Sequence, residues 1–134
     1  MTTTTLTKTP RTLIAAATSN AAGAQTRGTA DLRTAQGGVL TVKITNGATG
    51  PTVPATVNIL IAHNARATPT AAAAGADWKT LWSFAASTGN NVITEQSITI
   101  DPAVMHLEVE VTGNTAQAVT CEAYLSEITS VATA

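Results

Sequence analysis

The sequence predicts an all-β protein, an antiparallel sandwich or barrel of about eight strands. Apolar and polar residues alternate with a period of two in six segments, which is the pattern of a sheet with one buried and one polar face. Turn-forming clusters such as Gly37-Gly38 and Gly113-Asn114 separate the segments and favour hairpins over crossover helices. The one helix-favouring run, residues 71–74, is too short to be a stable helix alone.

The six clear segments lie at residues 40–45, 57–62, 80–85, 97–100, 105–111 and 119–126. Weaker candidates near residues 12–17 and 29–34 bring the total to about eight strands. In each clear segment the alternate apolar positions are expected to face the core, because side chains of a strand alternate between its two faces. These positions are Leu40, Val42, Ile44, Val57, Ile59, Ile61, Trp82, Phe84, Ile98, Ile100, Met105, Leu107, Val109, Val111, Val119, Cys121, Ala123 and Leu125.

With 134 residues the chain has the length of one domain, which we place at residues 12–134. Residues 1–11 are expected to form an extended, Thr-rich N-terminal arm whose apolar anchors are Met1 and Leu6. Burial of two apolar side chains does not offset the conformational entropy that the backbone of the arm loses on ordering. We therefore expect the arm to be either disordered or held by another molecule. Residues 64–77, rich in Ala, Thr and Pro, are expected to form a long loop that is functional or disordered.

The composition excludes several classes of protein. The chain is 44% hydrophobic and 11% charged, and it contains 27 Thr and 26 Ala. These values disfavour a charge-rich disordered chain and a strongly basic nucleic-acid binder, and the single cysteine rules out an internal disulfide. No apolar run approaches the roughly 20 residues of a membrane-spanning helix. Surfaces of Thr, Ala and Gly lose little side-chain entropy on contact, so they suit large, flat protein interfaces.

Charge is distributed unevenly along the chain. Residues 1–66 contain six basic residues and one acidic residue, whereas residues 67–134 contain one basic and seven acidic residues. Two interpretations remain open at this stage. The two halves attract each other across one core, or the molecule presents a basic and an acidic face to different neighbours.

The first 25 residues partly mimic a secretory signal. Lys8 and Arg11 precede an apolar stretch, but this stretch covers only residues 13–17. A signal segment needs about 7–15 apolar residues. We therefore expect synthesis in the cytoplasm without cleavage.

The sequence offers few groups for catalysis. His63 ends a predicted strand and enters the long loop, and His106 is expected to be a solvated side chain on a polar sheet face. Cys121 falls on an apolar face and is expected to be a small buried side chain. Spacings typical of zinc, calcium, phosphate-loop and serine-nucleophile sites do not occur. We therefore expect no enzymatic activity, no cofactor and no metal site.

Glu108 and Glu110 project from one face of a predicted strand, and Glu122 is expected on the neighbouring strand of the same face. Glycosidases also use carboxylate pairs, but they hold them within a cleft. We interpret the three residues as an outward-facing acidic stripe that is screened by water or met by a basic neighbour.

Three of the four aromatic residues lie within seven positions of one another, at Trp78, Trp82 and Phe84. Trp82 and Phe84 share one strand face and are expected in the core, whereas Trp78 precedes the strand and is expected at a surface or interface. The alternative is a platform on which Trp78 and Trp82 stack against sugar rings.

Several segments together resemble the small head decoration, or cement, proteins of tailed bacteriophages. They are the Thr-rich arm, the run TLIAAATSNAAGAQTRGTADLRTAQGGVLTVKITNGATGP, the Ala-rich loop before DWKTLW, and the closing VMHLEVEVTGNTAQAVTCEAYLSEI. The resemblance covers most of the chain. It implies a β-sandwich of jelly-roll type without enzymatic activity. Its place would be the outer capsid surface, over joints between major capsid subunits.

The resemblance also implies the partners, namely the major capsid protein and further copies of this chain, as a dimer or trimer, with no nucleic acid and no membrane. The protein would be made in the host cytoplasm and located on the virion. Two alternatives stay open: another virion part, such as a tail tube, collar or adaptor subunit, and a carbohydrate-binding module. The candidate partner-binding residues are Lys8, Arg11, Trp78, Glu108, Glu110 and Glu122.

Overall fold

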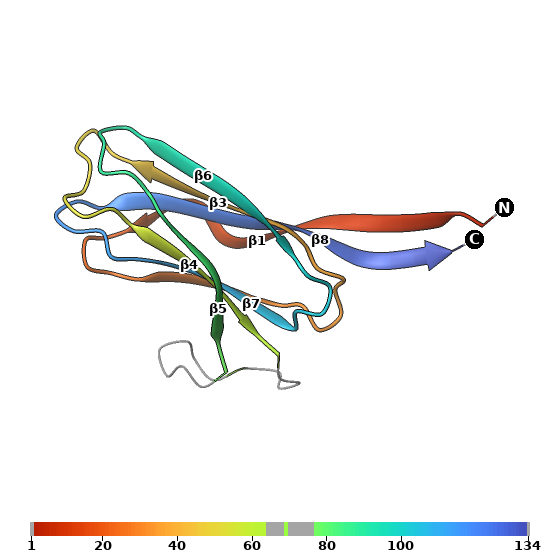
Figure 1. Cartoon of the computed structure of the whole chain (residues 1–134). Helices are drawn as coiled ribbons and strands as arrows, with labels where there is room; N and C mark the ends of the chain where they lie inside the picture. The colour runs from red at the N-terminus through yellow and green to blue at the C-terminus, as the bar shows by residue number, and fades with distance from the viewer. Residues whose placement is uncertain (1, 64–68, 70–76, 134) are drawn as a thin grey trace.

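The computed structural model describes residues 2–63, Pro69 and residues 77–133, and within them the chain forms eight β-strands (Figure 1). The described residues contain no helix, and therefore none of the length and apolar character needed to cross a membrane. The predicted helix-favouring run at 71–74 and most of the 64–77 loop lie outside the described residues. The strands are β1 (Thr4–Asn20), β2 (Thr26–Asp31), β3 (Gly38–Asn46), β4 (Thr56–Ala62), β5 (Lys79–Ala85), β6 (Ile93–Ile100), β7 (His106–Thr112) and β8 (Val119–Thr133).

The strands form two antiparallel four-stranded sheets that pack face to face. The first sheet has the order β1-β8-β3-β6 and the second the order β2-β7-β4-β5. Only β4 and β5 are both consecutive in the chain and paired in one sheet; every other connection between consecutive strands crosses from one sheet to the other. This is the double-sheet jelly roll. The predicted fold class is confirmed.

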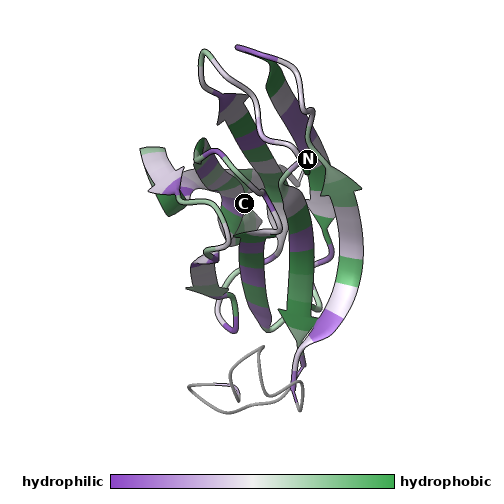
Figure 2. Cartoon of the chain, turned by 90° about the vertical axis from the view of Figure 1, so that its left-hand side faces the viewer, coloured by the Kyte–Doolittle hydropathy of each residue, from purple (hydrophilic) through white to green (hydrophobic). Residues whose placement is uncertain are grey.

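The core lies between the two sheets and follows the predicted alternation. Leu40, Val42 and Ile44 of β3 are buried in one cluster with Leu107 and Val109 of β7, and the cluster also holds most of the other expected positions. Bands of hydrophobic and hydrophilic residues alternate along the strands in Figure 2.

Met105 is the exception to the predicted core, because it is 36% exposed. It lies just before β7, and its carbonyl accepts a hydrogen bond of 2.8 Å from the amide of Leu32. Its position in a connecting segment explains why the alternation of the strand does not extend to it.

The N-terminal arm is extended, but the expectation that it lacks a partner in its own chain is wrong. β1 runs without interruption through residue 11, and its pairing with β8 extends from Thr4 opposite Thr133 to Asn20 opposite Val119. The backbone hydrogen bonds of this ladder order a segment whose side chains bury little surface. Three register shifts interrupt the ladder, between Thr7 and Lys8, Thr12 and Ile14, and Ile14 and Thr18.

β1 and β2 approach each other closely where they close one side of the sandwich, although they belong to different sheets. Gly28 of β2 lies so near β1 that a Cβ atom there would be 2.3 Å from the carbonyl oxygen of Leu13 and 2.8 Å from a side-chain carbon of Ile14. Only glycine fits this approach without a shift of backbone atoms.

Gly28→Ala is therefore expected to lower the free energy of unfolding by roughly 1–3 kcal/mol, the usual cost of overpacking. Gly47→Ala is the matched control, because a Cβ there would have no neighbour closer than 4.0 Å. Urea unfolding followed by tryptophan fluorescence measures both. Equal stabilities of the two variants would contradict the close approach of β1 and β2.

Cys121 is buried in the core, as predicted, and its Sγ lies 3.4 Å from the carbonyl oxygen of Thr18. Burial raises the pKa of the thiol above its ordinary value. Since the thiolate is the reactive species, native Cys121 is expected to label far more slowly with a thiol reagent than the same residue in urea. Cys121→Ala is expected to cost about 1 kcal/mol. Rapid labelling of the native protein would contradict the core position.

Candidate interaction surface

The outermost parts of β1 and β8 form a two-stranded ribbon that extends beyond the sandwich (Figure 1). The ladder between β3 and β8 ends with Gly38 opposite Glu127, and Ile128 still bonds to Gln36 and Gly37, so β8 beyond Ile128 pairs only with β1 among the described residues. We call residues 4–8 of β1 and 128–133 of β8 the terminal ribbon. A lone two-stranded ribbon is marginally stable in water, because it has no third strand and no covered face.

The terminal ribbon is exposed on every side except at Ile128, which is half-buried. Leu6 lies opposite Val131, so the two form an exposed apolar pair. On the other face, the hydroxyl of Thr129 lies 3.1 Å from that of Thr9. Beyond Ile128, the outer edges of the ribbon carry amide and carbonyl groups that pair with no other described strand and are able to pair with a strand of another molecule.

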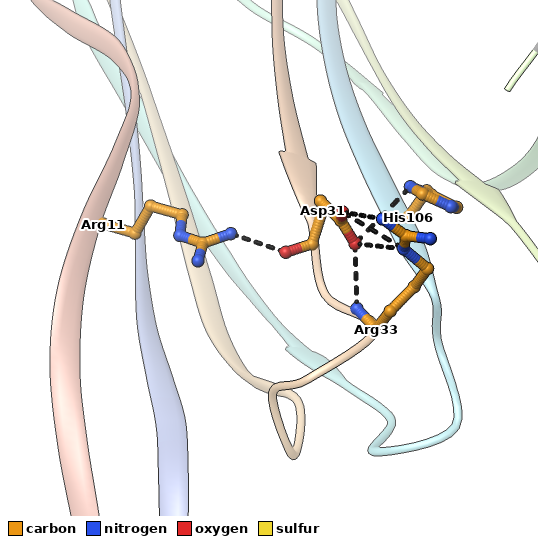
Figure 3. A network of polar contacts seen from close by, with 4 residues as sticks. All are labelled: Arg11, Asp31, Arg33 and His106. Atoms are coloured by element: carbon orange, nitrogen blue, oxygen red, sulfur yellow. Dashed lines mark hydrogen bonds and ion pairs between the residues drawn. The ribbon is translucent and has the colours of Figure 1, made fainter. Parts of the chain in front are cut away.

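Arg11 fixes the root of the terminal ribbon. Its Nη2 lies 3.1 Å from Oε1 of Glu127 on β8, and its Nη1 donates a 2.8 Å hydrogen bond to the backbone carbonyl of Asp31 on β2. Figure 3 shows this side chain reaching from β1 across to β2. The contact joins the two sheets, because β1 and β8 belong to the first sheet and β2 to the second. Arg11 thus binds a carboxylate and a backbone carbonyl of its own chain.

A groove of about 290 Å³ lies where the terminal ribbon leaves the first sheet. Val39 on its wall is 44% exposed, whereas Ile100 is 1% exposed. Lys8 is the charged residue of the lining, and it makes no ion pair with any described residue. The full lining consists of Lys8, Gln36, Gly38, Val39, Thr99, Ile100, Pro102, Ser126 and Ile128.

The outer face of the second sheet is not the solvated acidic stripe that the sequence predicts. Leu107, Val109 and Val111 face the core, so His106, Glu108 and Glu110 do point away from it. However, His106 is only 1% exposed and Glu108 only 6%. β7 is a central strand, and the side chains of β2 and β4 on either side contribute to covering this face. The expectation of surface positions for His106 and Glu108 is therefore wrong.

A polar cluster surrounds His106, the first residue of β7 (Figure 3). The carboxylate of Asp31 accepts hydrogen bonds from Arg33 at 2.7–3.1 Å, and these hold the pKa of Asp31 at about 2. Nδ1 of His106 lies 3.9 Å from Asp31. Nε2 of His106 and Oε2 of Glu108 are buried and have no hydrogen-bond partner among the described residues.

Trp78 is also part of this cluster and is not at a free surface. It is 7% exposed and meets the ring of His106 edge to face, at 6.5 Å between centroids and 75° between planes. The expectation that Trp78 is exposed is wrong, because it packs on the outer face of the sheet and not against the core between the sheets. Trp82 and Phe84 are half-buried against that core, as predicted.

Glu122 does not share a face with Glu108 and Glu110. β8 belongs to the first sheet and β7 to the second, so the turn between them crosses the sandwich where a hairpin was expected. The carboxylate of Glu122 lies 3.3 Å from Nζ of Lys43 on β3. The tight turn after Thr112 is compatible with either connection, and the local sequence therefore does not distinguish them.

The uneven charge along the chain is largely neutralised within the molecule. Three ion pairs of 2.8–3.3 Å join the basic half to the acidic half. They are Arg11 with Glu127, Arg27 with Glu110, and Lys43 with Glu122. Asn58 also donates a 3.0 Å hydrogen bond to Glu110. This supports the first of the two interpretations, in which the halves attract each other across one fold.

Of the candidate partner-binding residues, the structure brings only Lys8 to the terminal ribbon and its groove. The C-terminal half of the ribbon is absent from the candidates, because the predicted strand ends at residue 126. β-branched residues at Ile128, Thr129, Val131 and Thr133 were the available signal that this strand continues. Within the described residues, no group of three or more His, Cys, Asp or Glu side chains is placed to hold a metal ion.

The sequence matches no protein-family model and no curated protein. Its fold is similar to that of several solved structures. The K3 adhesin domain of Lys-gingipain from Porphyromonas gingivalis matches with a TM-score of 0.54 and 8% identity, over 78% of this chain and 64% of that one. PirA matches at 0.53 and 17% identity, over 87% of this chain and 92% of that one.

The third is VP2 of infectious bursal disease virus, in its subviral particle, with a TM-score of 0.52 and 10% identity. The match covers 91% of this chain but 32% of the VP2 chain. The fold is therefore shared with a viral capsid protein and with other proteins that contain a β-sandwich. At these identities the likeness extends to the fold alone.

The buried carboxyl of Glu108 yields a prediction about pH. Burial raises its pKa above 4.5, against the opposing effects of Arg27 and of a 3.4 Å hydrogen bond from Thr29. An acid with a higher pKa in the folded state costs stability as pH rises, because the unfolded chain ionises first. Glu108→Gln is therefore expected to raise the free energy of unfolding at pH 7, with the gain shrinking as pH falls through the raised folded-state pKa and nearly absent below 4.5.

Urea unfolding of both proteins at pH 7 and at a pH below 4.5 measures this difference in stability. Glu122→Gln is the control, since it only removes the half-exposed ion pair with Lys43 and is expected to give no gain. A Glu108→Gln variant that is equally destabilised at both pH values would show that the carboxylate contributes favourably to the fold.

Proposed function

We propose that this protein is a non-enzymatic structural subunit of a phage virion, which decorates and stabilises the capsid by binding the shell of the major capsid protein. The observation that carries the proposal is the terminal ribbon, which projects from the jelly roll and, beyond Ile128, pairs with no third strand of the described chain. A structure that is marginal alone and firmly anchored at its root gains stability when another molecule covers it. Copies of the chain on neighbouring shell sites would also contact each other.

The character of the surface supports the same proposal. Four ion pairs between described residues neutralise much of the charge internally. The outward side of the first sheet carries hydroxyl side chains such as Thr45, Ser97 and Thr99. Flat, weakly charged contacts of this kind are modest singly, but they add up when many copies bind one shell. The likeness to the VP2 fold agrees with a capsid role at the level of architecture.

A sugar-binding function receives less support. A stacking platform requires an exposed aromatic face, but Trp78 is buried and Trp82 is half-buried. Tyr124, at 40% exposure, stands alone on the outer face of the first sheet. Another virion position, in the tail or collar, would use the same ribbon and is distinguished by which particle the protein binds.

Removal of the terminal ribbon tests the proposal. Deletion of residues 2–7 and 129–134 keeps the contact of Arg11 with Glu127 and the 2.7 Å hydrogen bond from Gln36 to the carbonyl of Ile128. The trimmed protein is expected to melt within a few degrees of the full chain, because the deleted residues bury little surface. Its binding to undecorated heads is expected to fall by more than about tenfold.

Co-sedimentation with undecorated heads and with isolated tails of the same phage measures the binding. Heads that bind the trimmed and the full-length chain equally well would show that the ribbon is passive. Binding to tails and not to heads would favour the other virion position.

A further inference from the structure

The groove at the root of the terminal ribbon continues an apolar strip along one face of the molecule. Lys8 lies opposite Ile128 and Ser126 lies opposite Val39, and all four residues line the groove. Leu6 precedes Lys8 by two residues on β1 and therefore points to the same side. The register of the two strands shifts between Thr7 and Lys8, because β8 has one extra residue, Thr129, at this point. The side chains of β1 therefore keep their alternation between the two faces.

Three large apolar side chains are exposed along this strip. Leu6, Val131 and Val39 are 48%, 52% and 44% exposed. Ile128, which is half-buried, adds apolar surface to the same groove, whereas Ile100 belongs to the core beneath it. Contiguous exposed apolar surface on a protein with a polar exterior marks a site of contact with another molecule.

The size of the groove indicates what enters it. A volume of about 290 Å³ lies just below the range of roughly 300–1,000 Å³ that is typical of small-molecule sites. The lining also lacks the convergent polar groups that orient such ligands, since Lys8 is its one charged residue. The groove fits a protruding aliphatic side chain of a protein better than a free small molecule.

Lys8 indicates the charge of the partner. Arg11, Arg27, Arg33 and Lys43 each form an ion pair with a carboxylate of their own chain, but Lys8 forms none with a described residue. An ammonium group at the rim of an apolar groove gains most from a carboxylate that is brought in together with the apolar group.

We infer that this groove is the socket for the major capsid protein, and that it takes an aliphatic side chain of the capsid protein between Val39 and Ile128 while an adjacent carboxylate of the same protein pairs with Lys8. The inference rests on the proposed function and assigns its contact site. Leu6 and Val131 lie against the same partner and lengthen the apolar contact along the terminal ribbon.

A second copy of the chain fits this socket less well. In a two-fold contact the same patch meets itself, so Lys8 of one copy approaches Lys8 of the other. The groove lining contains no carboxylate that would separate the two charges. Glu110, Glu122 and Glu127 are each paired with a cation of their own chain. The charge pattern therefore favours a different protein that presents an acidic residue.

Two substitutions in the full-length chain test the socket by co-sedimentation with undecorated shells of the same phage's major capsid protein. Val39→Ser removes apolar contact, and Lys8→Glu places a negative charge against the partner's carboxylate. Each is expected to weaken shell binding by roughly tenfold or more, as at the centre of an interface. Lys8→Arg keeps the charge and is expected to bind within about threefold of the original chain.

Val53→Ser is the matched control for Val39→Ser, because Val53 is equally exposed, at 48%, but lies in the loop between β3 and β4. It is expected to bind shells as the original chain does. Lys8 is exposed on the ribbon, so Lys8→Glu tests the socket even if Val39→Ser impairs folding, which thermal melting reveals.

Three outcomes would overturn the inference. If the original chain binds shells and both Val39→Ser and Lys8→Glu bind equally well, the socket is wrong while the proposed function stands. If the original chain does not bind shells, the proposed function fails and the socket fails with it. If the substitutions abolish self-association in sedimentation velocity but leave shell binding intact, the occupant is a second copy.

Discussion

The antiparallel pairing of β1 with β8 is the constraint on which the rest of the structure depends. It joins segments from opposite ends of the chain, from Thr4 opposite Thr133 to Asn20 opposite Val119. Within the sandwich, this ladder places β8 between β1 and β3 and completes the first sheet. Beyond Glu127, where β3 no longer pairs with β8, the same ladder continues as the terminal ribbon. The projecting surface is therefore a continuation of a core strand pair and not an appended tail. This pairing is strongly non-local, and its loop-closure entropy must be repaid by contacts formed throughout the sandwich.

Electrostatics follows from the same topology. The jelly roll brings strands of the basic N-terminal half beside strands of the acidic C-terminal half, as with Arg27 on β2 beside Glu110 on β7 and Lys43 on β3 beside Glu122 on β8. Cross-strand neighbours of opposite charge stabilise a sheet modestly, and like charges in those positions would destabilise it. The uneven charge of the sequence therefore stabilises the pairing of strands from the two halves of the chain. Lys8 differs from Arg11, Arg27 and Lys43, because it forms no ion pair with a described residue.

The sequence was sufficient to predict the class of fold and most of the core, because these depend on a local period of two. The positions of Leu40, Val109 and Cys121 follow directly from that alternation. Exposure of the outer faces was harder to predict, since it depends on neighbours that are distant in the sequence. Glu108 lies on the polar side of its strand, yet it is buried, because β7 is a central strand with β2 and β4 on either side. The partner of β1 was also beyond local reasoning. Polar strands such as residues 4–10 are ordered by backbone pairing with a second segment, and no side-chain pattern within them specifies that segment.

The edge of β1 is protected along the sandwich and left open along the ribbon. Pro10 removes a backbone donor, and the register shifts between Thr12 and Thr18 interrupt the regular edge, with Ala17 at a φ of 60°. Bulges and proline are common means by which edge strands avoid pairing with other molecules. From Thr4 to Thr7 the ladder has no such interruption. The sandwich thus resists edge-to-edge association, whereas the ribbon keeps regular, exposed edges next to its apolar pair and groove. This difference along one strand leaves its regular, exposed edge at the end of the molecule where Lys8 and Val39 lie.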